Sequence, residues 1–451
     1  MNSEFPGSTV PKTGAPPAAD SPLPVLRSIT FPRAAVQDNG FLDLLVRDDA
    51  LVWGRRGEGL VGFGEVARFT ATGPNRFATL RRWWSDISAA ASVEDAVGLP
   101  GTGPVAFSAI AFSAASPYAS RLVVPRLVVG RSGDTGWITL TTADPEAELS
   151  AAAAEQLLAD LLDDRSPERD LAPGEDRLVP GQVSETQYEE SVRAGVRAID
   201  SGDLTKLVLA RDAVAELGAD IAVSQVLREL ALRYADCWTY SVDGLIGSTP
   251  EMLVKVTGDT ARARVLAGTL DRATAPAGDD GYAARMLSGS EKQRHEHRLA
   301  IDSLTAELGP LVTGMASPDE PFVLELPNVW HLASDVEAQL RVHDDGTSPS
   351  ALDLAEVLHP TAAVCGTPTA VADELILRLE GMDRGPYAGP VGWVDTSGNG
   401  EFGIALRGGV VESPTRVRLY AGCGIVAASD PAAELAESWA KMRPMREALN
   451  L

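Results

Sequence analysis

Apolar and polar positions alternate over short stretches in the first part of the chain, and this pattern predicts strands. Residues 51–53 and 107–113 are two such stretches, and Gly and Pro residues between them supply turns, as is typical of antiparallel strands. An alanine-rich run over residues 146–162 has the spacing of an amphipathic helix, and residues 163–180 form a polar connector that contains proline. The first part is therefore predicted to consist mainly of antiparallel strands.

From residue 184 onwards, helical spacing alternates with short apolar runs. Ser184 and Gln187 have the spacing of a capping box, which predicts a helix that runs to residue 199. The further elements expected are a buried strand over 206–211, a helix over 224–234, strands near 238–242 and 252–256, and one long helix over 282–308. Helices fall between pairs of strands without a strict βαβ rhythm, so the pattern predicts an α+β fold and not a doubly wound sheet.

The composition indicates the class of protein. The chain has 451 residues, of which 45% are hydrophobic and 23% charged, as in ordinary soluble globular proteins. Residues 1–22 are rich in Pro, Gly, Ser and Ala and are expected to form a flexible tail, without an apolar run long enough for a signal peptide or a membrane span. The three cysteines, Cys237, Cys365 and Cys423, are expected to be small buried residues without a chemical role, which suits a cytoplasmic protein.

The formal net charge of −24 narrows the range of partners. Nucleic acid and anionic membrane surfaces both require a cationic protein face, so neither is expected to bind. A small anionic substrate is still compatible with this charge if cations gather at the site itself.

A helix near the end of the chain carries Glu434, Glu437 and Lys441 on one face, because residues three and four apart are neighbours on a helix. Two interpretations are open. The three residues can form a solvated face with one Glu–Lys ion pair. Alternatively, a glycine turn at Gly422 places backbone N–H groups before the helix, which would suit an anion and, between the carboxylates, a divalent cation. Glu296 could join Glu437 in supplying the oxygen ligands that Mg²⁺ prefers.

Lys206 and Glu251 suit acid–base chemistry. Lys206 begins the buried strand, so its ammonium either enters a partly desolvated space, where it could act as a base, or reaches back to water. Glu251 follows a proline and precedes an apolar strand, where it could be a general acid or a surface glutamate.

Several other residues could contact a ligand. Arg407 ends a predicted strand and could clamp a carboxylate, and Tyr387, in a glycine-flanked turn, could donate a phenol hydrogen bond. Gly268 and Thr269 offer a backbone N–H and a hydroxyl in an expected loop. His297 lies within the long helix, where packing or hydrogen bonding is expected of it in preference to metal binding.

Taken together and in this order, the segments resemble the chorismate-utilising enzyme family and, within it, the isochorismate synthases. The resemblance covers about residues 184–449, and residues 23–180 would be a variable N-terminal part of the same single domain, 23–451. The motifs that carry it are KLVLAR from Lys206, STPE ending at Glu251, LAGT ending at Thr269, KQRHEH ending at His297, VWHL around His331, HPTAAVCGTP from His359, DRGPYAG around Tyr387, AGCGIV around Gly422 and ELAE from Glu434 to Glu437.

The resemblance implies a large α+β fold, in which two antiparallel sheets flanked by helices enclose the site, and a Mg²⁺-dependent conversion of chorismate to isochorismate. Lys206 would activate water for attack at C2, and Glu251 would protonate the departing C4 hydroxyl. The other roles implied are Glu296 and Glu437 as metal ligands with Glu434 beside them, Tyr387, Arg407, Gly422 and Lys441 around the enolpyruvyl carboxylate, and Gly268, Thr269 and His331 around the ring.

Lys206 also indicates the branch of the family. Ammonia-using relatives usually carry Gln at this position, so the lysine implies water as the nucleophile, no glutamine amidotransferase subunit, and no obstacle to a monomer. Salicylate synthases share the lysine and then eliminate pyruvate, and a catalytically silent homologue that binds an aromatic acid or a partner protein is a third alternative. Gln293 stands where many relatives have an acidic residue, which implies one carboxylate fewer near the metal.

Overall fold

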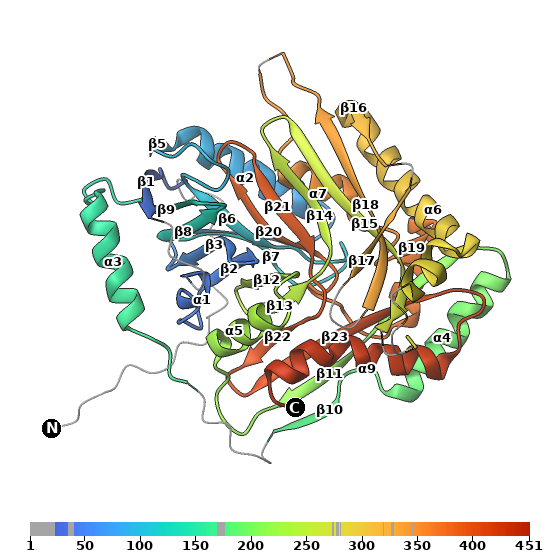
Figure 1. Ribbon diagram of the computed structural model, residues 1–451. Coiled ribbons are helices and arrows are strands. Elements are labelled where there is room, and N and C mark those ends of the chain that lie inside the picture. Colours follow the sequence, from blue (N-terminus) through green and yellow to red (C-terminus); the bar gives the residue numbers. More distant parts are fainter. Residues whose placement is uncertain are drawn as a thin grey trace.

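Two large, mainly antiparallel sheets form the frame of the molecule, as Figure 1 shows. The computed structural model describes residues 23–34, 40–168, 176–272, 275–276, 279, 281–318, 320–325, 329–344 and 346–451, without the side chains of residues 34, 267–269, 271, 292, 296, 299 and 329. The predicted tail, residues 1–22, lies outside the described residues. Among the described strands, the pairing of β1 with β5 is the parallel one.

The first sheet runs from strands that lie at or after Arg177 in the sequence to the N-terminal strands. Its spatial order is β10 (Arg177–Pro180), β11 (Lys206–Glu216), β23 (Arg416–Ile425), β22 (Gly408–Ser413), β13 (Leu245–Thr249), β12 (Trp238–Val242), β2 (Leu51–Arg55), β3 (Glu58–Phe63), β8 (Leu127–Ser132), β9 (Thr135–Thr142), β1 (Arg27–Ala34) and β5 (Ser92–Asp95), with β19 (Gly366–Thr367) beside β11.

The second sheet joins strands from both halves of the chain. Its spatial order is β16 (Val312–Ala316), β18 (Val329–Leu340), β15 (Thr260–Asp271), β14 (Met252–Thr257), β21 (Gly400–Ile404), β20 (Pro390–Asp395), β6 (Val105–Ala109), β7 (Ser120–Val124) and β4 (Ala67–Ala71), with β17 (Phe322–Glu325) beside β18.

Helices cover the outer faces of both sheets. They are α1 (Gly40–Asp43), α2 (Arg76–Ala90), α3 (Ala151–Asp163), α4 (Glu185–Asp200), α5 (Val223–Arg233), α6 (Glu291–Leu308), α7 (Ala351–Leu358), α8 (Thr369–Leu379) and α9 (Pro431–Ala448), with short turns η2 (Ala284–Ser288) and η3 (Gly309–Leu311). Helices α4, α8 and α9 pack on β11 or β23, whereas α2, α6 and α7 pack on the second sheet. The predicted α+β fold with two antiparallel sheets flanked by helices is confirmed. No helix in the described ranges is both long and apolar enough to cross a bilayer.

The two sheets pack face to face through large apolar side chains. Trp53 of β2, Phe107 of β6 and Trp393 of β20 are buried in one cluster that draws on both sheets. Burial of such aromatic side chains is a main source of stability in a core. Strands from residues 23–180 thus share one core with strands from the rest of the chain.

Local sequence signals explain several helix boundaries. Ser184 forms the predicted capping box with Gln187, and α4 begins at the next residue. Helix α3 starts later than the alanine pattern predicts, because Ser150 accepts a hydrogen bond from the N–H of Ala153 and so fixes the first turn.

The long helix predicted over residues 282–308 is wrong. The π-helical turn η2 ends at Ser288, and the N–H of Gly289 closes it on the carbonyl of Ala284. Ser290 then accepts a hydrogen bond from the N–H of Gln293 and starts α6 anew. A glycine followed by a good N-cap residue outweighs the continuous apolar spacing.

Three local predictions near the site are also wrong. Gly268 and Thr269 lie within strand β15 and not in a loop, and the strand register shifts between Ala267 and Thr269. The expected glycine turn at Gly422 is part of strand β23. Arg407 does not end a strand but lies in the connection between β21 and β22.

Candidate active site

A cavity of about 300 Å³ lies where β11 and β23 of the first sheet approach β15 and β18 of the second. Helix α9 contributes Glu437 and Lys441 to its wall. The predicted site residues that line it are Lys206, Glu251, His331, Tyr387, Arg407, Gly422, Glu437 and Lys441. They come from distant parts of the sequence, so the fold brings the motifs together in one cavity.

The other predicted residues lie close by along the backbone. Thr269 pairs in register with His331, and Gly268 precedes it on β15. Glu296 lies on α6 three residues after Gln293, which lines the cavity. The side chains of Thr269 and Glu296 lie outside the described part of the structure, so the predicted role of Glu296 as a metal ligand stays a prediction.

Two glycines of β23 make room for functional side chains. A Cβ at Gly424 would lie 3.1 Å from Cε of Lys206, and a Cβ at Gly422 would lie 3.2 Å from the phenol oxygen of Tyr387. Both separations are tighter than ordinary van der Waals contact. The glycines of the AGCGIV motif therefore allow the lysine and the tyrosine to lie against the strand.

Lys206 is the first residue of β11 and pairs with Thr367 of β19. It is partly buried and lines the cavity. Of the two sequence interpretations, the geometry favours the lysine that enters a partly desolvated space.

Glu251 lines the cavity from the link between β13 and β14. Burial raises the pKa of its carboxyl to about 7, although the nearby charges of Lys206, Arg407 and Lys441 act in the opposite direction. No described residue donates a hydrogen bond to this carboxyl. Near neutral pH a substantial fraction of Glu251 is therefore protonated, as a general acid must be.

Arg407 and Tyr387 face the cavity from bent segments of backbone. Arg407 has a φ of +51° and Ala388, which follows Tyr387, has a φ of +61°, values that non-glycine residues rarely adopt. Among the described residues, no carboxylate pairs with the guanidinium of Arg407. Tyr387 stacks on Tyr420 with ring centroids 5.2 Å apart, and burial raises the pKa of its phenol, which keeps a proton available for donation.

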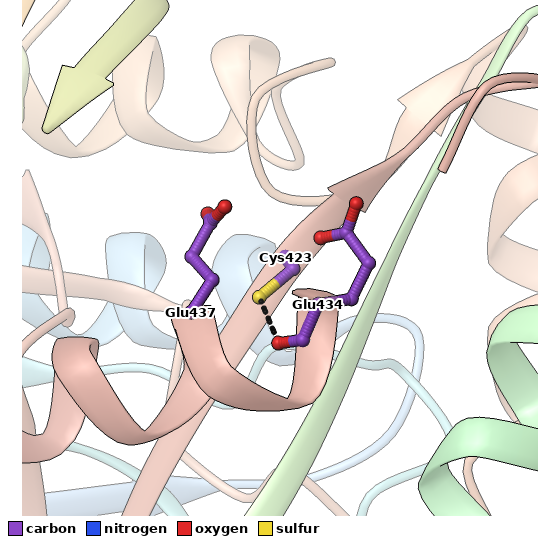
Figure 2. A group of neighbouring side chains, drawn as sticks. All are labelled: Cys423, Glu434 and Glu437. Atoms are coloured by element: carbon purple, nitrogen blue, oxygen red, sulfur yellow. Dashed lines mark hydrogen bonds between the residues drawn. The ribbon is translucent and has the colours of Figure 1, made fainter. Parts of the chain in front are cut away.

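Helix α9 carries the acidic pair, and Figure 2 shows the two carboxylates on the same side of the helix with Cys423 between them. Potential ligand atoms of Cys423, Glu434 and Glu437 all lie within 4.8 Å of one another. Glu434 accepts a hydrogen bond of 2.7 Å from the hydroxyl of Ser429. The side chain of Asp430 caps the start of the helix by accepting a hydrogen bond from the N–H of Ala433, which disfavours the interpretation that this helix end binds an anion.

The surroundings of Glu434 and Glu437 shift the pKa values of the two carboxyl groups in opposite directions. Burial raises the pKa of Glu434, and the charge of Glu437 adds to this effect. Burial also acts to raise the pKa of Glu437, but the charge and hydrogen bond of Lys441 outweigh it, so the pKa of Glu437 is lowered. Burial raises the pKa of the Cys423 thiol to about 12, and the thiol lies 3.3 Å from the carbonyl of Glu434. The thiol of Cys423 therefore keeps its proton at neutral pH, and the oxygen donors of this group are the two carboxyl groups.

Sequence reasoning missed a buried ion pair behind the cavity. Arg384 donates from Nε to Glu380 at 2.9 Å and from its two other nitrogens to the carbonyls of Val364 and Val208. Glu380 accepts a 2.7 Å hydrogen bond from the N–H of Ala210. The pair fixes strand β11, which carries Lys206, to the cavity wall. An acid and a base four residues apart were the signal in the sequence.

The expectations that His297 makes a hydrogen bond and that the three cysteines are buried are confirmed. His297 is buried on α6 and its Nε2 lies 2.9 Å from the hydroxyl of Ser334 on β18. Cys237, Cys365 and Cys423 are free and buried.

Comparison with known proteins agrees with this geometry. The family model described as chorismate binding enzyme matches residues 24–450. The chain belongs to this chorismate-binding enzyme family.

Relatives within the family carry the name that the sequence resemblance predicted. Isochorismate synthase DhbC of Bacillus subtilis is 37% identical over 275 residues, which are 58% of this chain and 68% of the relative. The salicylate biosynthesis isochorismate synthase of Pseudomonas aeruginosa is 33% identical over 415 residues, covering 89% of this chain and 84% of the relative. The resemblance to the isochorismate synthases that the sequence motifs predicted is thereby confirmed.

Solved structures show the same fold. The DhbC protein of Bacillus anthracis superposes with a TM-score of 0.70 at 27% identity and covers 91% of this chain and 100% of its own. The menaquinone-specific isochorismate synthase MenF of Escherichia coli, at 24% identity, gives a TM-score of 0.73 and covers 94% and 95%.

Proposed function

We propose that this chain converts chorismate to isochorismate with Mg²⁺ as its cofactor. The observation that carries the proposal is that Lys206 and Glu251, the two residues that the chemistry requires, line one cavity from different elements. The names of the relatives support the same reaction.

The cavity suits a dianionic substrate in spite of the net charge of the chain. Its described lining includes the cations Lys206, Arg384, Arg407 and Lys441, against the acids Glu251 and Glu437. Surface charges beyond a Debye length of about 8 Å are largely screened at physiological salt. Arg407, which has no carboxylate partner in the described part of the chain, is the group that would bind the enolpyruvyl carboxylate, together with the phenol of Tyr387.

Lys206 and Glu251 then divide the proton transfers. Lys206 takes a proton from a water molecule as its oxygen bonds to C2, and Glu251 gives a proton to the oxygen that leaves C4. Each transfer requires the right protonation state, an uncharged amine for the base and a carboxylic acid for Glu251. The raised pKa of Glu251 supplies the second condition at neutral pH.

The donor set on α9 fits Mg²⁺. Carboxylate oxygens are the ligands that this hard cation prefers, and two of the three side chains in the cluster carry carboxyl groups. Glu437 and Glu434, with Glu296 from α6, would hold the ion, which would supply positive charge for the ring carboxylate of the substrate.

The proposal also covers the oligomeric state and the partners of the chain. Water as nucleophile requires no glutamine amidotransferase subunit, and we propose that the chain acts in the cytoplasm as a monomer.

Product analysis tests the function. Purified protein is incubated with chorismate and Mg²⁺, with and without EDTA, and the products are separated by HPLC. We expect isochorismate without pyruvate, and its loss in EDTA. Pyruvate and salicylate in equal amounts would assign the chain to the salicylate synthases, and binding of chorismate without any turnover would identify a catalytically silent homologue.

A further inference from the structure

A second cavity of about 180 Å³ lies behind Glu251. It shares Glu251, Leu266 and Ala363 with the main cavity, so these residues form the wall between the two. Its other wall is formed partly by α6, where it reaches the exposed residues Ser303 and Glu307. We call this space the rear chamber. Glu251 thus borders the substrate cavity on one side and a route to the protein surface on the other.

Two residues that line the rear chamber each carry a buried polar atom without a hydrogen-bond partner among the described residues. The buried hydroxyl of Thr361 is one, and Nδ1 of His359, a residue only 9% exposed, is the other. Nε2 of His359 lies 3.1 Å from the carbonyl of Phe112 and therefore donates to it, which leaves Nδ1 as an acceptor. Buried polar atoms are normally satisfied by protein or by ordered water.

Water fits this chamber. A single buried water needs only about 10–15 Å³ of such volume, and it needs two to four polar partners. Thr361, His359 and Glu251 all line the chamber, and their hydroxyl, imidazole nitrogen and carboxyl are groups of the kind that bind water. Burial lowers the pKa of His359 to about 3, so its ring stays neutral and Nδ1 remains an acceptor at all working pH values.

The proposed reaction leaves Glu251 in need of a proton. In one turnover an O–H bond of water breaks, its oxygen joins C2 and its proton goes to Lys206. The C4–O bond breaks, and the leaving oxygen takes the proton of Glu251 and departs as water. The cycle therefore ends with a charged Lys206 and an ionised Glu251, while the product fills the main cavity. Lys206 gives its proton to solvent through the main cavity when the product leaves, and Glu251 must take up one proton.

We propose that the rear chamber holds a short chain of water molecules, bound by Thr361 and His359, that returns a proton from solvent to Glu251 from the side away from the substrate. This role rests on the proposed function. Thr361 and His359 are positioning residues for that water and do not contact the substrate.

Two variants test the proton route. Ala300→Leu fills the rear chamber from α6, and Thr361→Val removes the hydroxyl and keeps the side-chain shape. Ala306→Leu is the matched control, because it places the same change on the exposed side of the same helix. We measure kcat, KM for chorismate and the solvent deuterium isotope effect on kcat, with melting temperature as a check of folding.

We expect both chamber variants to lower kcat by about tenfold, at the low end of the usual contribution of a proton-transfer group, with KM unchanged and with a larger isotope effect. Ala306→Leu should match the wild type. A kcat equal to that of the control would overturn the proposal, and so would a fall in kcat without a larger isotope effect, which indicates a merely structural defect. If the wild type itself forms no isochorismate, the proposed function has failed, and a high-resolution crystal structure still tests the chamber. The absence of ordered water between Glu251 and Thr361 would then overturn the chamber proposal independently.

Discussion

The ammonium of Lys441 lies 2.7 Å from a carboxylate oxygen of Glu437, one turn earlier on the same helix. The same ammonium donates a 2.8 Å hydrogen bond to the carbonyl of Gly422 on β23. Lys441 therefore neutralises one of the carboxylates proposed to hold Mg²⁺, and it does so at the wall of the cavity. The ion pair predicted from the i,i+4 spacing is present, but it faces the cavity and not only solvent.

Replacing Lys441 separates its effect on chorismate binding from its effect on Mg²⁺ binding. Lys441→Met should raise the pKa of Glu437 and raise KM for chorismate by about tenfold or more, because a hydrogen bond to a charged group is worth about 1.5–3 kcal/mol. The affinity for Mg²⁺ without chorismate should not fall, since the ammonium competes with the cation for Glu437. Titration calorimetry measures the metal affinity. Lys255→Met, which breaks the 2.7 Å Lys255–Glu401 pair away from the cavity, should change neither value. Weaker Mg²⁺ binding at unchanged KM would contradict this account.

The raised pKa of Glu251 predicts the pH dependence of the reaction. Only the protonated form can act as the acid, so kcat/KM should fall as the pH rises through about 7. Glu251→Gln cannot donate in this way, and its kcat should be lower by about 10²–10⁴-fold. Measurement of kcat/KM between pH 5 and pH 9 in about half-unit steps checks the profile. A profile without a fall on the alkaline side would remove Glu251 from the role of acid.

Replacement of Glu251 by an uncharged residue should increase the free energy of unfolding at alkaline pH. The pKa of Glu251 is higher in the folded than in the unfolded chain, so its ionisation destabilises the fold as the pH rises from about 4.5 through about 7. Glu251→Gln should therefore raise the free energy of unfolding at pH 8, by up to about 3 kcal/mol at 1.36 kcal/mol per pKa unit. The gain should vanish near pH 4. Urea denaturation at both pH values measures it, and an equal effect at the two would show that ionisation is not the cause.

The buried Glu380–Arg384 pair should be a large contributor to stability. Arg384→Met leaves a buried carboxylate without its partner and should cost about 3–5 kcal/mol of unfolding free energy. The double variant Glu380→Leu/Arg384→Met should cost less than the sum of the two single changes, since no unpaired charge remains.

Arg193→Met is the matched control for this pair. It breaks an exposed pair of the same i,i+4 spacing, Arg193–Glu189 at 2.7 Å, and should cost no more than about 0.5 kcal/mol. Denaturant unfolding compares four variants: the two single changes at Glu380 and Arg384, the double variant and Arg193→Met. Equal costs for the buried and the exposed pair would refute the structural role of Arg384.

The carboxylates of α9 predict the metal dependence. Glu437→Gln keeps the shape of the side chain and removes its charge, and it should weaken Mg²⁺ binding by at least about tenfold. Glu434→Gln should have a smaller effect, because Ser429 already satisfies one oxygen of Glu434. Glu447→Gln, at the far end of the same helix, is the control. Calorimetric titration with Mg²⁺ gives the dissociation constants of the wild type and of the three variants, and equal values for wild type and Glu437→Gln would exclude Glu437 as a ligand.

Local signals predicted the elements that depend on local interactions. The capping box at Ser184 fixed the start of α4, and the strand that begins at Lys206 follows from an apolar run. The site residues were predicted through motifs, and the cavity that gathers eight of them could not be derived from spacing alone. The pairing of β11 with β23, which places Lys206 beside Gly424, joins residues more than 200 positions apart.

The wrong prediction of a glycine turn at Gly422 has a tertiary cause. Glycine usually signals a turn, but Gly422 and Gly424 are glycines because Tyr387 and Lys206 occupy the space beside the strand. The buried partnership of Arg384 with the strand at Val208 likewise depends on tertiary contacts. Such requirements come from neighbours distant in sequence, so a local pattern can indicate the residue types but not the strands and side chains that they contact.

Isotope labelling tests the central claim, that Lys206 directs water to C2 of chorismate. Wild-type protein is incubated with chorismate and Mg²⁺ in H₂¹⁸O, and the isochorismate is analysed by mass spectrometry, with Lys206→Ala in parallel. We predict one ¹⁸O atom per isochorismate, at the C2 hydroxyl, and no isochorismate above background from Lys206→Ala. Unlabelled isochorismate, or labelled product formed by Lys206→Ala at the wild-type rate, would contradict the account.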